Sequence, residues 1–412
     1  MTHEVPEGWR KSTIGDISDV VTKGTTPTTL GYGYQTKGIP FLKVENIDES
    51  GNIQKPSTFI TEECHCAFRR SIIKKDTILF TIAGTLGRIA VYKENQEANT
   101  NQAVALIKGI TENLCFVSYY LQSHGVRKLI EDQKTTGAQP NISLTQLKRF
   151  PIALPPLPEQ KKIAEVLSSV DEAIAATKAV IDQTKQVKKG LLQTLLTKGI
   201  GHTKFKQTEL GEIPESWEVL SLDDITPPDR KITYGIVQAG PHVDDGVPYI
   251  RVSDMNETGL SLKGMMRTSP DIAAKYKRSE VKGDDIVYAL RGKIGHVLPV
   301  PDFLSGANLT QGTARIAPGE RVTSRYLFWV MAAPRTVQLA LREVKGSTFK
   351  EITLKKLKSL LITVPPIEEQ NQIAEKFDGI ETALNVSLEK LAQLQVLKSG
   401  LMSDLLSGRK RV

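Results

Sequence analysis

The chain has 412 residues, which at ~100–200 residues per domain predicts two to four domains. Its 40% hydrophobic and 24% charged residues are typical of a globular protein, and no apolar run approaches the ~18 residues of a membrane span. Three cysteines are too few for a disulfide framework and no secretory signal opens the chain, so we expect a reducing cytoplasm. The net charge of +8 permits a polyanionic partner but does not require one.

The second half of the chain repeats the first. The segment Val-Pro-Glu-Gly-Trp at residues 5–9 returns 208 residues later as Ile-Pro-Glu-Ser-Trp, and the same offset aligns residues 38–44 with residues 246–252. Near the end of each copy, Pro-Pro-Leu-Pro-Glu-Gln at residues 155–160 corresponds to Pro-Pro-Ile-Glu-Glu-Gln at residues 365–370, an offset of 210. So small a drift indicates a tandem duplication.

The first part of each copy predicts a β-rich domain, over residues 1–155 and again over residues 201–365. Short runs of β-branched and aromatic residues between Gly, Pro, Asn and Asp are typical of strands, and in the first copy they lie at residues 39–44, 77–82 and 89–92. A shorter helical stretch is expected near residues 116–131 and 326–343.

The last part of each copy, residues 156–200 and 366–412, predicts a long helix entered through proline. Apolar residues recur in alternating steps of four and three over five heptads, which favours a coiled coil. The predicted packing residues are Ile163, Leu167, Val170, Ile174, Ile181, Leu191 and Leu195, and then Ile373, Phe377, Ile380, Leu384, Leu391, Leu401 and Leu405. Each helix would be roughly 60 Å long, against a domain width of about 30 Å. The alternative is that each helix packs only on its own domain.

We therefore expect an α+β protein with two similar β-rich domains and two long helices. Helices that share one register are natural partners for each other. Antiparallel pairing would place the domains at opposite ends of a shared coiled coil, related by a pseudo-twofold axis.

These features together resemble the specificity subunit of type I restriction–modification systems. The cues are Pro-x-x-Trp early in each copy, Gly-aliphatic-Pro-aromatic in a strand, Gly-x-x-Gly in a hairpin and Pro-Pro-x-x-Glu-Gln before each helix, in the same order twice. The resemblance implies two target-recognition domains, each reading one half of a gapped sequence in double-stranded DNA. Because the two copies have diverged, we expect that sequence to be asymmetric. The resemblance also implies that the helices set the gap and dock two methyltransferase subunits, joined by restriction/translocase subunits. Those partners would carry S-adenosylmethionine, ATP and Mg²⁺, and this chain none.

The sequence favours no catalysis in this chain. It contains no cofactor-binding glycine turn, no Asn-Pro-Pro-Tyr motif and no P-loop. Asp271, followed by Glu280 and Lys282, resembles a metal-dependent nuclease spacing, but a charged loop explains it and the first copy lacks it. Cys64 and Cys66 flank a histidine without the second ligand pair of a closed zinc site. Two other classes stay open: a scaffold that assembles proteins without reading DNA, and a standalone enzyme.

Candidate DNA contacts fall into matched and unmatched positions of the repeat. Matched positions are expected to serve the fold or phosphate, and unmatched ones to read base edges. The matched candidates are Lys43 and Arg251 within a strand, the hairpin glycines Gly84, Gly87, Gly292 and Gly295 with the nearby cations Arg88 and Lys293, the glutamines Gln102 and Gln311, and Gly137 and Gly346 in polar loops. The unmatched candidates are the basic clusters Arg69 with Arg70, and Lys275 with Lys277 and Arg278, which suit the O6/N7 edge of guanine. Each has a structural alternative: a cation lying along a sheet edge, a turn without ligand, or a solvated charged face.

Overall fold

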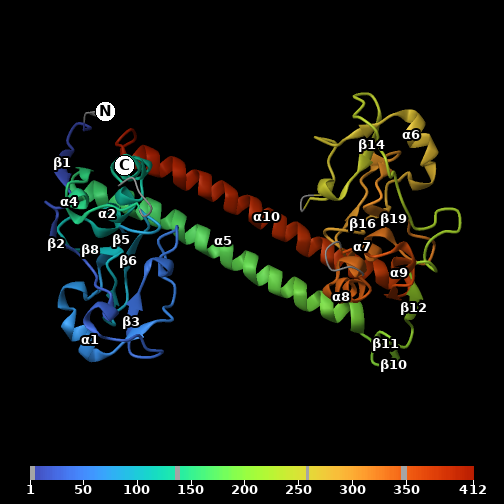
Figure 1. The fold of residues 1–412 in the computed structure, drawn as a ribbon, viewed down its shortest axis with the longest axis horizontal. Coiled ribbons are helices and arrows are strands. Elements are labelled where there is room, and N and C mark those ends of the chain that lie inside the picture. The colour runs from blue at the N-terminus through green and yellow to red at the C-terminus, as the bar shows by residue number, and fades with distance from the viewer. Residues whose placement is uncertain (1–4, 135–139, 257–258, 345–349) are drawn as a thin grey trace. The chain divides into compact units, whose positions relative to one another are not determined.

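The computed structural model describes residues 5–134, 140–256, 259–344 and 350–412. Its chain divides into two units, each holding one copy of the repeat and part of both long helices (Figure 1). Unit 1 comprises residues 1–178 and 389–412, and unit 2 comprises residues 179–388. Among the described residues, no helix combines the length and the apolar character needed to span a membrane.

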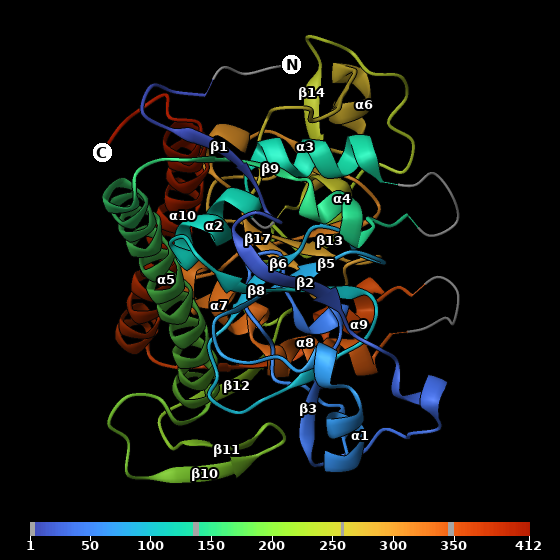
Figure 2. The same ribbon diagram turned by 90° about the vertical axis from the view of Figure 1, so that its left-hand side faces the viewer.

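The domain of unit 1 is built on three small sheets. A four-stranded antiparallel sheet has the order β2-β8-β5-β6 (Figure 2), a three-stranded sheet has the order β4-β3-β7, and β1 pairs with β9. The strands are β1 Arg10–Thr13, β2 Ser18–Lys23, β3 Ile39–Leu42, β4 Phe59–Ile60, β5 Thr77–Thr81, β6 Ile89–Tyr92, β7 Asn99–Thr100, β8 Val104–Ile110 and β9 Pro151–Leu154, and the helices are α1 Glu62–Ala67, α2 Leu114–Leu121, α3 His124–Gln133 and α4 Leu144–Lys148.

Strand β5 is buried along its whole length because both of its faces are covered. Successive side chains of a strand point to opposite faces of the sheet. Ile78 and Phe80 accordingly belong to the large core that includes α2, whereas Leu79 belongs to a second core with Leu42 and Ile47. The sheet therefore separates two apolar layers.

The domain of unit 2 repeats this topology strand for strand. Its sheets have the orders β13-β19-β16-β17, β15-β14-β18 and β12-β20, and the parallel pairing of β3 with β7 returns as β14 with β18. The strands are β12 Glu218–Ser221, β13 Thr233–Tyr234, β14 Val247–Ile250, β15 Arg267–Thr268, β16 Ile286–Ala289, β17 Val297–Pro299, β18 Asn308–Leu309, β19 Thr313–Ile316 and β20 Leu361–Val364, and the helices are α6 Pro270–Lys275, α7 Ser324–Ala332, α8 Pro334–Arg342 and α9 Leu354–Lys358. A hairpin of β10 (Phe205–Thr208) and β11 (Gly211–Pro214) precedes them.

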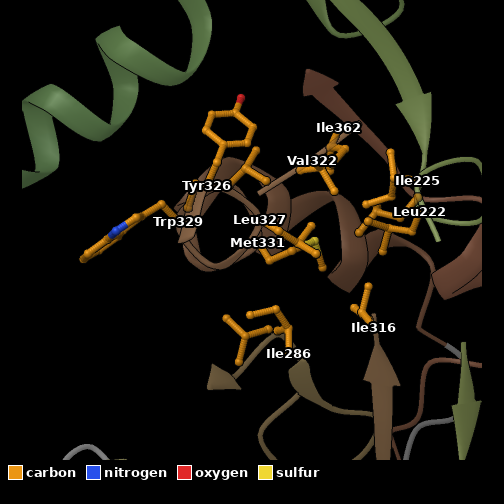
Figure 3. Close-up of a cluster of buried hydrophobic side chains, with 14 of the residues drawn as sticks. Leu222, Ile225, Ile286, Ile316, Val322, Tyr326, Leu327, Trp329, Met331 and Ile362 are labelled. Carbon is orange, nitrogen blue, oxygen red and sulfur yellow. The ribbon is translucent and has the colours of Figure 1, made fainter. Parts of the chain in front are cut away.

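The core of unit 2 forms where α7 covers the four-stranded sheet. Figure 3 shows Leu327 and Met331 of α7 among side chains of the strands, including Ile286 and Ile316. Tyr326 is fully buried, and its hydroxyl donates a hydrogen bond of 2.8 Å to the carbonyl of Thr363. The polar end of the ring is thus satisfied inside the apolar layer.

The single helical stretch expected after the sheet is two helices in each copy. In unit 1 the side chain of Ser123 accepts a hydrogen bond from the amide of Val126 and starts α3. In unit 2 Pro334 is the first residue of α8; it has no amide hydrogen to continue α7, but it suits a first helical turn.

The long helices are α5 (Leu157–Lys198) and α10 (Ile367–Leu406). In unit 1, Ile163 near the start of α5 shares a core with Leu405 at the end of α10. In unit 2, Leu195 at the end of α5 shares a core with Ile373 and Phe377 at the start of α10. Within each unit the start of one helix packs beside the end of the other, so the helices pair antiparallel (Figure 1).

The heptad positions of both helices are shielded from solvent. The buried ones are Ile163, Leu167, Val170, Ile174, Ile181, Leu195, Ile373, Phe377, Leu384 and Leu405, and the half-buried ones are Leu191, Ile380, Leu391 and Leu401. Near the end of α5 burial extends to Leu192 and Leu196, outside the predicted register. The apolar face widens there because the end of α5 packs against the core of the unit 2 domain as well as against α10.

Candidate nucleic-acid interface

A short basic turn follows the first small helix of each domain. In unit 1 it is the 3₁₀ turn Arg69–Ser71 after α1, and in unit 2 it is the turn Lys277–Ser279 after α6. Both are closed by the serine hydroxyl, which donates to the carbonyl of Phe68 at 3.0 Å in unit 1 and of Tyr276 at 2.8 Å in unit 2. We call these two segments the basic turns.

The basic turns correct the expectation that these clusters are unmatched. Arg69 and Arg70 stand at the offset of 208 from Lys277 and Arg278, in the same element of the same fold. The second position is arginine in both copies and the first is arginine in one and lysine in the other, so the sequence at the main offset already carries the match. By the argument that matched positions serve the fold or phosphate, the basic turns are candidates for phosphate contacts rather than for base reading.

A cation from the four-stranded sheet of each domain donates hydrogen bonds to backbone carbonyls in or just after the basic turn. The ammonium of Lys108 on β8 donates to the carbonyl of Ile72 at 2.7 Å and to that of Arg70 at 3.1 Å. The guanidinium of Arg315 on β19 donates to the carbonyl of Glu280, the residue equivalent to Ile72, at 2.6 Å. Burial lowers the pKa of both groups.

The cations of the basic turns are free to meet an anion. Arg69, Arg70, Lys277 and Arg278 are exposed, as is Lys275 at the end of α6. None of the five forms an ion pair with a described residue, and Arg70 donates only to the hydroxyl of Thr25, at 3.1 Å. Unpaired surface cations on a shared element are the electrostatic footprint of a phosphate-binding surface.

The glutamine turn of unit 1 lies beside its basic turn. Thr25 bonds to Arg70, and the next residue, Thr26, donates to the side-chain oxygen of Gln102, which is exposed. In unit 2 the backbone amide of Gln311 donates to the carbonyl of Ile236 at 2.9 Å, and the residue is likewise exposed. The structure therefore brings the candidate Gln102 close to the exposed cations of the basic turn in unit 1.

A pair of glycines, not identified from the sequence, allows the chain to pass close to β7 in unit 1 and to β18 in unit 2. A Cβ atom at Gly24 would lie 2.0 Å from the carbonyl oxygen of Thr100, and one at Gly235 would lie 1.9 Å from that of Leu309. No side chain fits at either position. The pair stands at an offset of 211 rather than 208, so a search for repeats at the main offset passes over it.

Lys43 and Arg251 lie just after strands β3 and β14, not within them. Each begins a 3₁₀ turn. The ammonium of Lys43 lies 4.9 Å from the ring centre of Tyr34, and the guanidinium of Arg251 binds both carboxylate oxygens of Asp254, which raises its pKa. The charge of Lys43 thus meets an aromatic ring and that of Arg251 meets an acid of its own turn, so both are already engaged within the fold.

The hairpin glycines serve the packing of the loop. Gly84, Gly87, Gly292 and Gly295 all have positive φ, from 69° to 87°. A Cβ at Gly87 would lie 2.8 Å from Ile130 on α3, and one at Gly295 would lie 2.9 Å from Val337 on α8. Arg88 donates to the carbonyl of Ile47 at 2.9 Å, whereas Lys293 is exposed. Gly137 and Gly346 lie outside the described residues.

The histidine between the two cysteines is engaged within the fold, and the residues of the nuclease-like spacing lie in and after α6. Cys64 is buried in α1, and the next residue, His65, lies 3.1 Å from Glu97 and 3.3 Å from Asn99. Asp271 is exposed in the first turn of α6, Glu280 follows the basic turn of unit 2, and Lys282 is exposed. Over the described parts of the chain, no three His, Cys, Asp or Glu side chains gather in a way that would hold a metal ion.

Comparison with known proteins agrees with this arrangement. The model of the type I restriction modification DNA specificity domain matches residues 6–186 and 214–398. The putative type I restriction enzyme MjaX specificity subunit of Methanocaldococcus jannaschii is 30% identical, with 99% of this chain and 95% of that protein covered. The type I restriction enzyme EcoBI specificity subunit of Escherichia coli is 29% identical, with 95% and 84% covered.

Solved structures share the fold. The S subunit of a type I restriction–modification system from M. genitalium has a TM-score of 0.59 at 17% identity, with 98% of this chain and 97% of that chain covered. A chain from a structure of the complex assembly of a type I restriction–modification system has a TM-score of 0.61 at 17% identity, with 98% and 99% covered.

The duplicated α+β domains, the antiparallel long helices and the paired basic turns define a two-domain DNA-specificity protein. The chain belongs to the type I restriction–modification DNA specificity family. Its role is sequence recognition on DNA, without a catalytic role of its own.

Proposed function

We propose that residues 1–155 and 201–365 are target-recognition domains that each bind one half of an asymmetric, gapped sequence in double-stranded DNA. The helical segments, residues 156–200 and 366–412, set the spacing of the halves and dock two methyltransferase subunits. Restriction/translocase subunits join this complex, and S-adenosylmethionine, ATP and Mg²⁺ act on the partner subunits. The complex works in the cytoplasm, where its DNA is.

The observation that carries the proposal is the pair of basic turns. Both domains keep two adjacent, exposed and unpaired cations at the same place, and a half-buried lysine in unit 1 and a buried arginine in unit 2 reach the equivalent carbonyl. A structural role alone does not require the exposed charges. Phosphate binding does, because each neutralised phosphate releases condensed counterions.

The asymmetry of the target follows from the divergence of the two domains. Next to the shared basic turns, unit 2 has the exposed cation Lys275 where the offset of 208 places Ala67 in unit 1. If bases are read at such unmatched positions, the two halves of the target differ in sequence.

A selection from randomised duplex DNA tests the proposal. The full chain, with and without its cognate methyltransferase, is allowed to bind, and the bound pool is sequenced. We expect two specified blocks of different sequence separated by an unspecified gap. Exchanging residues 1–155 for the corresponding part of a relative should change one block only.

Three results would contradict the proposal in different ways. Binding without a motif would assign the reading of sequence to another subunit. No binding in either format would favour a scaffold that assembles proteins without reading DNA. A change in both blocks after the exchange of one domain would mean that the domains do not read independently.

A further inference from the structure

A lysine in the apolar seam of α10 contacts two other elements of unit 1. The ammonium of Lys398 lies 2.6 Å from the carboxylate of Asp171 on α5 and 5.6 Å from the ring centre of Tyr119 on α2. The hydroxyl of Tyr119 in turn donates to Asp171 at 2.8 Å. The side chain of Lys398 is 17% exposed, so most of its length is shielded between the helices.

The same arrangement recurs in unit 2 with the two long helices exchanged. The ammonium of Lys188 on α5 lies 2.5 Å from the carboxylate of Glu381 on α10 and 5.0 Å from the ring centre of Trp329 on α7. The indole nitrogen of Trp329 donates to Asp378 on α10 at 2.7 Å. We call these two sets, Lys398 with Asp171 and Tyr119, and Lys188 with Glu381 and Trp329, the lysine bridges.

The lysine bridges are equivalent by the repeat. Lysine, acid and aromatic residue of one bridge each stand 210 residues from their counterparts in the other. The type of acid and the type of ring have changed, but the charge pair and the ring beneath the lysine have not. A lysine within a coiled-coil seam costs stability, since an apolar residue packs better there, and its best-attested use is to specify register.

Both bridges specify one register. Lys188 lies 17 residues after Asp171 on α5, and Lys398 lies 17 residues after Glu381 on α10, so a single antiparallel alignment satisfies both. The competing alignments are slips by one heptad, because they keep the apolar positions facing each other.

Neither heptad slip offers the lysines an acid. One direction places Lys398 opposite Lys178 and Lys188 opposite Leu388. The other direction places the two lysines opposite Ala164 and Ala374. A slip thus leaves a partly buried ammonium unpaired, or sets it against a like charge, in both halves at once.

We propose that the two lysine bridges select the helix register that sets the gap between the half-sites, and so act as positioning residues for the length of the DNA target. This rests on the proposed function. One heptad of slip moves a helix by about 10.5 Å along its partner, which is about three base pairs of B-DNA at 3.4 Å each. Removing both bridges should admit that second gap length.

The test compares K188M/K398M with the matched control K185M/K390M, which removes exposed lysines from the same two helices. Methionine fills the seam, so the helices stay paired. In complex with the methyltransferase, each variant is presented with duplexes whose two half-sites are separated by gaps of varied length. We expect the unmodified chain and the control to bind duplexes of one gap length only. For duplexes whose gap differs from it by about three base pairs, the affinity of K188M/K398M should be about tenfold higher than that of the unmodified chain or the control.

A charge exchange keeps the test decisive if the methionine variant binds poorly. The chain with K188E/E381K and K398E/D171K retains both attractions and should regain the single gap. A single unchanged gap in K188M/K398M would overturn the proposal. So would equal broadening in the charge-exchange chain.

A measurement without DNA separates this proposal from the proposed function. Spin labels on Val180→Cys and Val396→Cys, two exposed positions of the long helices, report the distance between them after Cys66 and Cys115 are replaced by serine. We expect one distance in the unmodified background and a second population in K188M/K398M. One distance in both would refute the register role whatever the DNA result, whereas two populations without a gapped motif would refute only the proposed function.

Discussion

Removing the charges of the basic turns should weaken the salt dependence of DNA binding by a predictable amount. The variant R69Q/R70Q/K277Q/R278Q loses four exposed cations, none of which pairs with a described acid. A cation that neutralises one phosphate contributes about 0.9 to the slope of log affinity against log salt, so four contribute about 3.6. Over a fourfold rise in salt, that is roughly a 150-fold difference in lost affinity.

The assay is a titration of labelled duplex carrying the selected target, at salt concentrations from about 50 to 200 mM. The matched control is K162Q/K185Q/K376Q/K390Q, which removes the same number of charges from exposed positions of the long helices. We expect the control to keep nearly the full slope. Because the basic turns are matched between the domains, the variant should select the same bases as the unmodified chain, with lower affinity.

Two outcomes would refute this reasoning. A slope that falls by less than about one would mean that the basic turns do not contact phosphate. An equal fall in the control would mean that the overall positive charge, and not the position of the cations, attracts DNA. A changed motif with an unchanged slope would instead make the basic turns readers of bases.

Three further predictions concern the fold and the spacer. G24A should destabilise unit 1 severely, because the new Cβ would overlap the carbonyl of Thr100, whereas G400A, on an open helix surface, should raise stability by up to about 1 kcal/mol; urea unfolding of both variants checks this. Inserting seven residues at equivalent places in both long helices should lengthen the selected gap by about three base pairs, and an unchanged gap would contradict the spacer role. The hydroxyl of Ser221 donates to Asp224 and lowers the pKa of its carboxyl, so this carboxylate contributes stability that is present at neutral pH and lost as the pH falls through the lowered pKa. In D224N the unfolding midpoint should therefore fall less steeply at acid pH than in the unmodified chain. An equally steep fall would show that the pairing is not linked to folding.

Local patterns in the sequence predicted the elements well where the pattern is regular. The strands near residues 77–82 and 89–92 appear as β5 and β6, and the heptad positions of α5 and α10 are shielded throughout. Such patterns are readable because a strand or helix that covers a core must repeat its apolar residues at its own period. The break between α2 and α3 depended on one capping serine, a much weaker signal.

The candidate site was less readable because only folding decides which group each charged side chain meets. Arg251 looked like a free cation until the structure set it against Asp254, and Arg88 until it met the carbonyl of Ile47. Arg69 and Lys277 stand at the main offset of the repeat, and the shared turn confirms that they occupy one position of the fold. Whether a charged side chain is paired within the fold or free to bind a ligand depends on which groups lie within hydrogen-bonding distance of it.

The sequence by itself determined the duplication, the β-rich character of both copies and the apolar register of the two long helices, since these depend on composition and period along one chain. Only the tertiary structure decided the rest. In the sequence, Lys188 and Lys398 stand at heptad positions that are otherwise mostly apolar. Folding brings each onto an aromatic ring and an acid from other elements. The reason is that register is the alignment of two helices with each other. The heptad pattern of each helix shows which of its residues face a partner, but not which residue of the partner lies beside each of them.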